Sequence, residues 1–172
     1  MSNAIKYSLY VLLYMQELPK PWFNLEAYKK IRLEEAKFEV EIAEKFLQEG
    51  LIRNAAGKVF QAWKSLLAAL LTDKRDVLVK KYPKKKSLGR RKIEFADWII
   101  AIVPTSYLEE LSLILGKEIN LLTEKALFIH EYQYNGPDKE AILSPFRSDE
   151  IAAENIKILI DEIKSILQRL QK

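Results

Sequence analysis

The sequence predicts an all-α fold, a single-domain antiparallel bundle of five to six helices, and three observations support this. Apolar residues recur at helical spacing through most of the chain, and no stretch alternates as a half-buried strand would. Gly50 separates two long amphipathic segments, as expected for a helical hairpin. The length of 172 residues favours one domain, and a hydrophobic content of 49% is sufficient for one core.

The first predicted element is a short helix over residues 1–18, which is apolar on almost every side. A long helical hairpin follows over residues 24–81. Asn24 is a suitable N-cap for its first arm, and Gly50 suits the left-handed position that ends this arm. The second arm runs from about Leu51 to Lys81. Small residues just after the turn are expected to let the two arms approach closely: Ala55, Ala56 and Gly57.

Residues 80–92 interrupt the helical pattern. They contain eight Lys or Arg, no acid, a proline and a glycine, so we predict a basic loop. Further helices are predicted over residues 93–135, one of which carries His130. The last predicted helix covers residues 148–171, beginning at a serine followed by two acids in its first turn.

Composition excludes several kinds of site. There is no cysteine, which rules out disulfides, thiolate metal sites and a cysteine nucleophile. One histidine with no carboxylates at ligand spacing predicts no metal site, and no motif for a cofactor is found. The longest early apolar run, Leu9–Met15, is too short to span a bilayer, so we expect no membrane partner, no signal peptide and a cytoplasmic location.

The basic segment is the first functional candidate. The whole chain has a net charge of +4, so this segment's positive charge leaves the remainder net negative. Such localised charge is typical of a phosphate-binding patch, although a solvated loop between helices is the plain alternative. The candidate phosphate-binding residues are Lys84, Lys85, Lys86, Arg90 and Arg91.

Aromatic residues do not add a second signal to this segment. Tyr82 is the only aromatic side chain within it, so a base-stacking platform is not predicted. The other prominent aromatic residues are expected to be core anchors: Trp22, Phe23, Trp63 and Trp98.

His130 is the second candidate. It shares a helical stripe with Ile119, Thr123, Ala126 and Tyr134, and therefore should face other helices. A histidine hydrogen-bonded for packing and a catalytic or ligand-contacting histidine both fit this pattern.

Two parts of the chain resemble the HEPN superfamily and, within it, the archaeal PaREP family. One part is the hairpin, with the runs Ala43–Leu47, Gln61–Lys64 and Leu67–Leu70 on either side of Gly50. The other is the run from Ala126 to His130, with its following turn and terminal amphipathic helix. The resemblance extends from about Glu26 to Leu170.

The resemblance implies a helical bundle that often dimerises and that either cleaves RNA without metal, binds nucleotides or acts beside a nucleotidyltransferase. The catalytic signature of the ribonucleases is an arginine four to six residues before the histidine. Here Lys125 lies five residues before His130, and no arginine lies between Arg91 and His130. Lysine lacks the planar guanidinium fork, and positions five apart on a helix point about 140° away from each other.

The leading prediction is therefore a non-catalytic module that binds nucleotide or RNA phosphate, with His130 and Lys125 as a secondary site. One alternative is a weak metal-independent ribonuclease that uses His130, with Lys125 in the place of the arginine. Another is a structural homodimer or an interaction module for a protein partner such as a nucleotidyltransferase.

Overall fold

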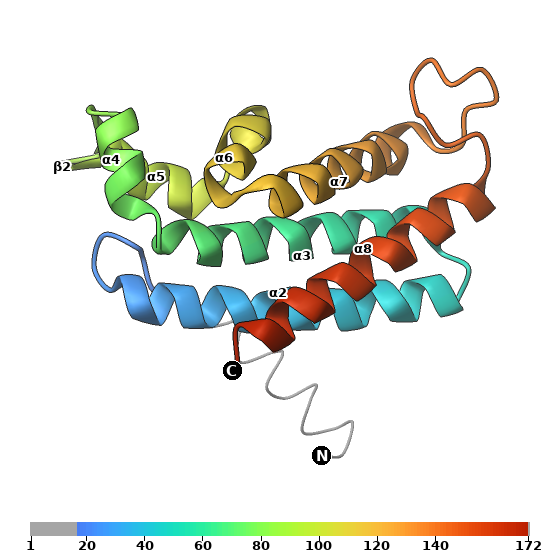
Figure 1. Cartoon of the computed structure of the whole chain (residues 1–172), viewed down its shortest axis with the longest axis horizontal. Coiled ribbons are helices and arrows are strands. Elements are labelled where there is room, and N and C mark those ends of the chain that lie inside the picture. Colours follow the sequence, from blue (N-terminus) through green and yellow to red (C-terminus); the bar gives the residue numbers. More distant parts are fainter. Residues whose placement is uncertain (1–16, 172) are drawn as a thin grey trace.

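The computed structural model describes residues 17–171, and this part is a single, mainly helical bundle (Figure 1). The all-α prediction is confirmed. The helix predicted over residues 1–18 lies, except for its last two residues, outside the described part. The α-helices are α2 Leu25–Gln48, α3 Ile52–Thr72, α4 Arg75–Lys81, α5 Phe95–Ile102, α6 Leu108–Leu115, α7 Lys117–Asn135 and α8 Asp149–Arg169. A 3₁₀ turn, Thr105–Tyr107, precedes α6.

Helices α2 and α3 form the predicted hairpin, and its ends are capped as expected. The Asn24 side chain accepts a hydrogen bond from the Ala27 N–H at 2.9 Å. At the turn, Gly50 has φ +73°. The N–H of Leu51 reaches the Phe46 carbonyl and that of Gly50 reaches Leu47, which is the Schellman arrangement that ends a helix.

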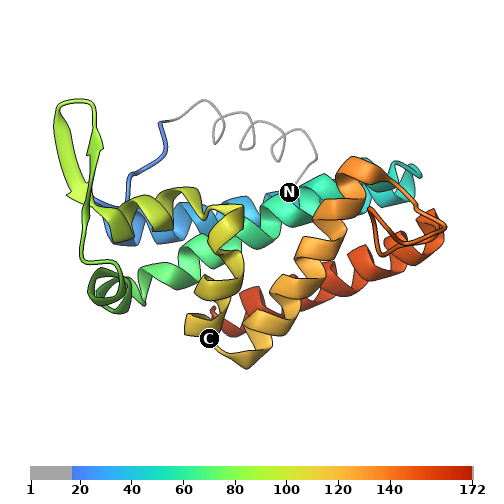
Figure 2. The same ribbon diagram turned by 90° about the horizontal axis from the view of Figure 1, so that it is seen from above.

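Helix α3 is the most buried helix and packs against α2, α5, α6, α7 and α8. Figures 1 and 2 show α8 crossing the hairpin, with α6 and α7 covering another side of α3. Trp63 is fully buried at the centre, and its indole N–H donates to Thr123 Oγ1 of α7 at 3.1 Å. The predicted role of Trp63 as a core anchor is confirmed, and a polar contact fixes α7 against α3.

The second arm of the helical hairpin was predicted to continue to about Lys81, and this is wrong, because helix α3 ends at Thr72. The Thr72 hydroxyl donates to the Ala69 carbonyl at 2.6 Å, and such a side-chain bond competes with the helical pattern. The following Asp73 carboxylate binds Lys29 of α2, with Nζ–O distances of 2.7 and 2.8 Å. The chain therefore turns at residues 73–74 and continues as the separate short helix α4.

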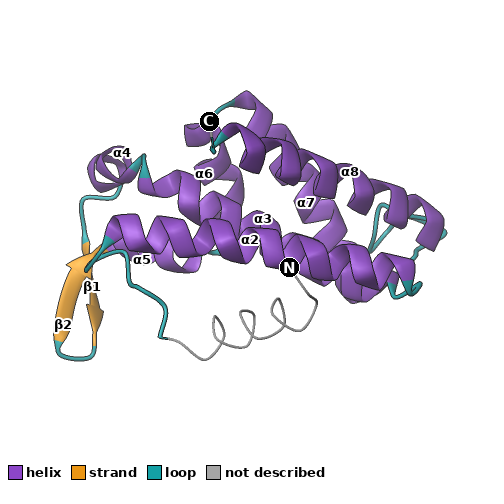
Figure 3. Ribbon diagram, turned by 90° about the horizontal axis from the view of Figure 1, so that it is seen from below, coloured by secondary structure: helices purple, strands orange, loops and turns teal. Residues whose placement is uncertain are grey.

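The prediction of an irregular loop over the basic segment is also wrong, because most of this segment forms a β-hairpin. Strands β1 Lys85–Leu88 and β2 Arg91–Glu94 pair antiparallel and project from one end of the bundle (Figure 3). The two residues between them are Gly89, with φ +59°, and Arg90, whose φ is not positive. This is the pattern of a type II′ turn, whose twist matches that of paired strands.

The loop between α7 and α8 is organised around Asp138. Its carboxylate accepts hydrogen bonds from the backbone N–H groups of Glu140, Ile142 and Leu143 at 2.7–3.0 Å. These bonds hold the pKa of Asp138 below its usual range. The loop is thus hydrogen-bonded internally, although the side chains of Ile142 and Leu143 are exposed.

Candidate functional site

The two strands of the basic hairpin place the predicted phosphate-binding residues on two faces. Residues directly opposite one another in an antiparallel pair share a face. Lys86 pairs with Ile93, and Leu88 pairs with Arg91, so these form the face that turns toward the bundle. Lys85 lies on the other face, opposite Glu94.

Three of the basic side chains lie over aromatic rings. The Lys84 ammonium is 4.0 Å from the centroid of the Phe95 ring, and that of Lys86 is 4.5 Å from the Trp98 ring. The Arg91 guanidinium is 4.4 Å from the Phe23 ring. Each contact of this kind contributes roughly 0.5–1 kcal/mol at an exposed site, which is enough to favour one position of a long cation.

These rings come from outside residues 80–92, where the sequence offers only Tyr82. Phe23 was predicted to be a core anchor, but 63% of it is exposed beside the hairpin. Trp98 is half-buried and stacks on Phe95 with centroids 5.2 Å apart. The aromatic residues come from the segment before α2 and from α5, far from residues 80–92 in sequence, so local composition does not reveal them.

Acidic neighbours neutralise only part of the charge. Lys85 Nζ lies 3.6 Å from Glu94 Oε1, and Lys81 Nζ lies 2.9 Å from Glu110 Oε1. Arg90 and Lys92 form no ion pair with any residue between 17 and 171. Burial raises the pKa of Tyr82 at the base of the hairpin, so its hydroxyl stays neutral.

An ion pair fixes the helices beside the hairpin. Arg75 of α4 donates from Nε and Nη2 to the two carboxylate oxygens of Asp97 in α5, at 2.6 and 2.9 Å. The Asp97 side chain is only 3% exposed. This hydrogen bonding raises the pKa of Arg75. Because α4 leads into β1 and β2 leads into α5, the pair joins the two ends of the basic hairpin.

His130 lies against α3, as predicted from its helical stripe. Its ring stacks on Phe60 with centroids 4.0 Å apart and meets the edge of Tyr134 at 5.0 Å. Its Nδ1 lies 3.3 Å from the Gln133 Oε1. An amide oxygen only accepts, so Nδ1 carries the proton in this contact.

Lys125 and His130 contact different helices. The Lys125 Nζ donates to the Asn155 Oδ1 of α8 at 2.6 Å, whereas His130 stacks on α3. Arg53 of α3 contacts the C-terminal end of the helix that carries His130. It donates from Nε to the Gln133 carbonyl at 2.9 Å and from Nη2 to the Tyr134 carbonyl at 2.6 Å. Sequence reasoning along one helix missed Arg53, because only the fold brings it to α7.

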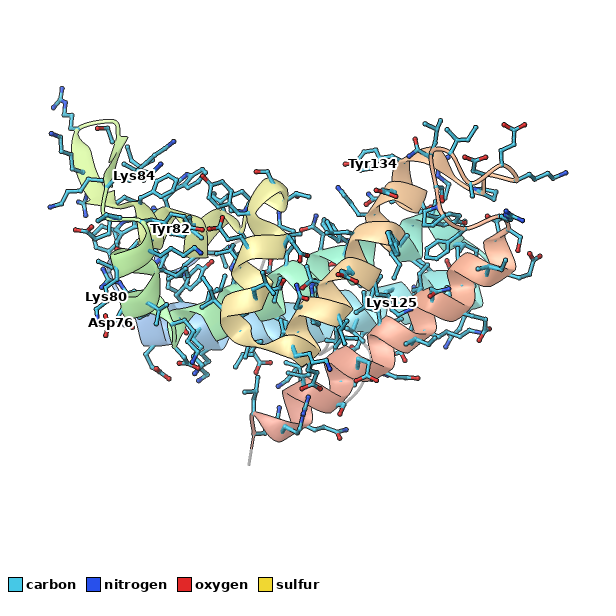
Figure 4. The ribbon with its side chains drawn as sticks, turned by 45° about the horizontal axis from the view of Figure 1, so that its top comes forward. Asp76, Lys80, Tyr82, Lys84, Lys125 and Tyr134 are labelled. Atoms are coloured by element: carbon cyan, nitrogen blue, oxygen red, sulfur yellow. The ribbon has the colours of Figure 1, made fainter. Side chains whose placement is uncertain are left out.

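The basic hairpin and the His130 region lie at opposite ends of the bundle. Figure 4 shows Lys84 and Tyr82 at one end and Tyr134, one turn beyond His130, toward the other. The five predicted phosphate-binding residues are therefore together on the hairpin, but they do not share a cleft with His130 in one copy of the chain.

Within residues 17–171, no group of three or more His, Asp or Glu side chains is arranged to hold a metal ion. In the same range no single helix has the length and apolar character needed to cross a membrane. The segments Phe95–Ile102 and Thr105–Leu115 pass that test only as a pair bent by 110°.

Comparison with known proteins adds one finding. A model of the archaeal PaREP1/PaREP8 family matches residues 31–157. The chain belongs to the archaeal PaREP1/PaREP8 family. The match to PaREP1/PaREP8 includes both the basic hairpin and His130. No curated protein and no solved structure matches the chain.

Proposed function

We propose that this member of the PaREP1/PaREP8 family is a non-catalytic module that binds RNA through the basic hairpin. The observation that carries the proposal is the row of cation–aromatic pairs: Lys84 with Phe95, Lys86 with Trp98, and Arg91 with Phe23. Cations that follow a backbone, beside aromatic rings on which bases stack, are the combination used to bind single strands.

The geometry favours a single strand over a duplex. Phe23 is exposed, so its ring is accessible to an unstacked base. Trp98 is only partly exposed, because Phe95 stacks on it and Lys86 lies over it, so we assign the base-stacking role to Phe23. A planar guanidinium such as that of Arg91 is itself a stacking surface for bases. The bases of a duplex are stacked on one another, so it would engage the cations alone.

A filter-binding titration with single-stranded RNA at several salt concentrations tests this function. Replacing Lys84, Lys85 and Lys86 together by Ala should weaken binding and reduce the salt slope by about 2, since each phosphate contact adds about 0.7 for a single strand. The matched control replaces Lys117, Lys139 and Lys157, which are exposed and belong to α7, to the loop before α8 and to α8, not to the hairpin. Equal effects of the two triple variants would reject a hairpin site.

A Phe23→Leu variant separates stacking from charge. It keeps an apolar side chain but removes the ring, so single-stranded RNA should bind about 5- to 100-fold more weakly, as expected for loss of one stacked base. Binding of duplex RNA should hardly change. Equal losses for both forms of RNA would contradict base stacking at Phe23.

The ribonuclease alternative rests on a relationship to the HEPN superfamily, which the α2–α3 helical hairpin and the helix that carries His130 suggest. In this proposal His130 would move a proton, with Lys125 or Arg53 as the cation. RNA cleavage by the wild type and by His130→Ala decides it, because equal rates would exclude the enzyme. A homodimer is a further proposal, tested by the mass of the intact chain in solution.

A further inference from the structure

A polar groove lies at the end of the bundle opposite the basic hairpin. It has a volume of about 620 Å³, which is in the range of sites for small molecules. Helix α3 contributes most of its wall, α7 and α2 the remainder. The lining residues are Phe46, Arg53, Asn54, Gly57, Lys58, Gln61 and Gln133.

Gly57 makes room for one polar side chain in this groove. A Cβ atom at Gly57 would lie 2.8 Å from the Gln133 Nε2, closer than real Cβ atoms come. Gly57 thus allows α7 to pack closely against α3. It was instead predicted from the sequence to allow α2 and α3 to approach each other. Glycine inside a helix costs about 1 kcal/mol of stability relative to alanine. At position 57 this loss of helix stability leaves space for the Gln133 side chain.

The Gln133 amide is held by its neighbours. Its Oε1 accepts from His130 Nδ1, which directs the Nε2 group to the side of Gly57 and the groove. His130 is itself held between the stacked ring of Phe60 and the edge of Tyr134. The amide therefore presents N–H donors in a fixed direction.

Two cationic side chains, Arg53 and Lys58, line the groove together with this amide. Arg53 is anchored by the carbonyls of Gln133 and Tyr134, and its Nη1 makes no hydrogen bond to residues 17–171. Lys58 Nζ lies 3.0 Å from the buried Glu39 carboxylate, which offsets one of the two positive charges and leaves the groove net positive.

Two further amides of the groove, Asn54 and Gln61, are exposed and form no side-chain hydrogen bonds within the described part of the chain. Amide donors and cations directed at one space from two helices suit an anion with several oxygens. We infer that this groove binds the phosphate group of a small phosphorylated ligand, at a site separate from the RNA-binding hairpin.

NMR of the single histidine tests the inference, because His130 touches Gln133 and its ring gives unambiguous signals. Titration with AMP or inorganic phosphate should shift these signals saturably. AMP tighter than phosphate identifies a nucleotide as the source, and equal affinities identify phosphate alone. Acetate should bind more weakly than either, because it offers fewer oxygens. No saturable shift at millimolar AMP and phosphate, or a tighter acetate, overturns the inference.

Two variants locate the site. Gly57→Ala displaces Gln133, and Asn54→Ala with Gln61→Ala removes two amides, so each should weaken phosphate binding roughly tenfold. Circular dichroism should show that Gly57→Ala is as stable as the wild type, since alanine favours helix. The triple Lys84, Lys85 and Lys86→Ala variant is the matched control and should bind AMP normally. Unchanged affinity in both groove variants, or loss in the control, refutes the groove site while leaving the hairpin proposal to its own test.

Discussion

Removing Arg75 should destabilise the end of the bundle that carries the basic hairpin. In Arg75→Met the Asp97 carboxylate, 3% exposed, loses both of its guanidinium hydrogen bonds, at 2.6 and 2.9 Å. Methionine retains most of the side-chain length, so the change acts on charge and hydrogen bonding rather than on volume. The buried carboxylate is then left without its ion-pair partner.

The magnitude follows from the burial of the two partners. Breaking a buried ion pair on one side costs about 3–5 kcal/mol. The Arg75 side chain is 33% exposed, so water reaches part of the site and we expect a value at the lower end, about 3 kcal/mol. For a chain of this size each kcal/mol corresponds to about 2–4 °C, giving a fall in Tm of roughly 6–12 °C.

Thermal unfolding followed by circular dichroism measures this change. The double variant Arg75→Met with Asp97→Leu removes both charges and should recover most of the lost stability. Arg75→Lys should lie between the wild type and Arg75→Met, because lysine supplies charge without the two-pronged contact. A fall below about 1 kcal/mol for Arg75→Met, or a double variant no more stable than the single one, would refute the reasoning.

Three further predictions concern the fold. Thr123→Val should lower the unfolding free energy by about 1–3 kcal/mol in urea titrations, because the buried Trp63 N–H loses its acceptor; an unchanged midpoint would refute this. Gly50→Ala should lower the unfolding free energy by about 1–2 kcal/mol, because alanine is strained at the φ of +73°. A Cβ atom there meets nothing within 4 Å, so no steric clash adds to this cost. The same urea titration measures the change, and a gain in stability would contradict the prediction. Asp138 has a lowered pKa, so the order it gives its loop is present above the usual pKa of 3.8 and is lost as pH falls through the lower pKa of the folded state. The NMR shift of the Ile142 amide should therefore change only below pH 3.8, and a change centred at or above pH 3.8 would contradict these hydrogen bonds.

Helical periodicity was sufficient to predict most of the fold. The caps at Asn24 and Gly50 depend on neighbouring residues only, so the sequence reveals them. The break after Thr72 depends on a contact between Asp73 and Lys29 of another helix. The β-hairpin was missed because its strands have four residues each and are rich in lysine, which has low strand propensity.

The candidate sites were predicted less completely than the fold. The basic residues of the hairpin form a run in the sequence and were found directly. The rings of Phe23 and Trp98 and the Arg53 side chain come from other elements, and each reaches its site through tertiary packing. Pattern reasoning along one segment identifies charge, but it does not identify what the fold places beside that charge.

The length of α3 sets a minimum length for any ligand that would engage both ends of the bundle. Arg53 lies in the first turn of this helix, and α4 and the hairpin follow its last turn. At 1.5 Å per residue, the helix between them spans roughly 30 Å. A mononucleotide is too short to bridge that span, so it and an RNA strand would occupy the protein independently. An oligonucleotide long enough to reach both ends would gain affinity by avidity, so binding plotted against RNA length should rise in a step.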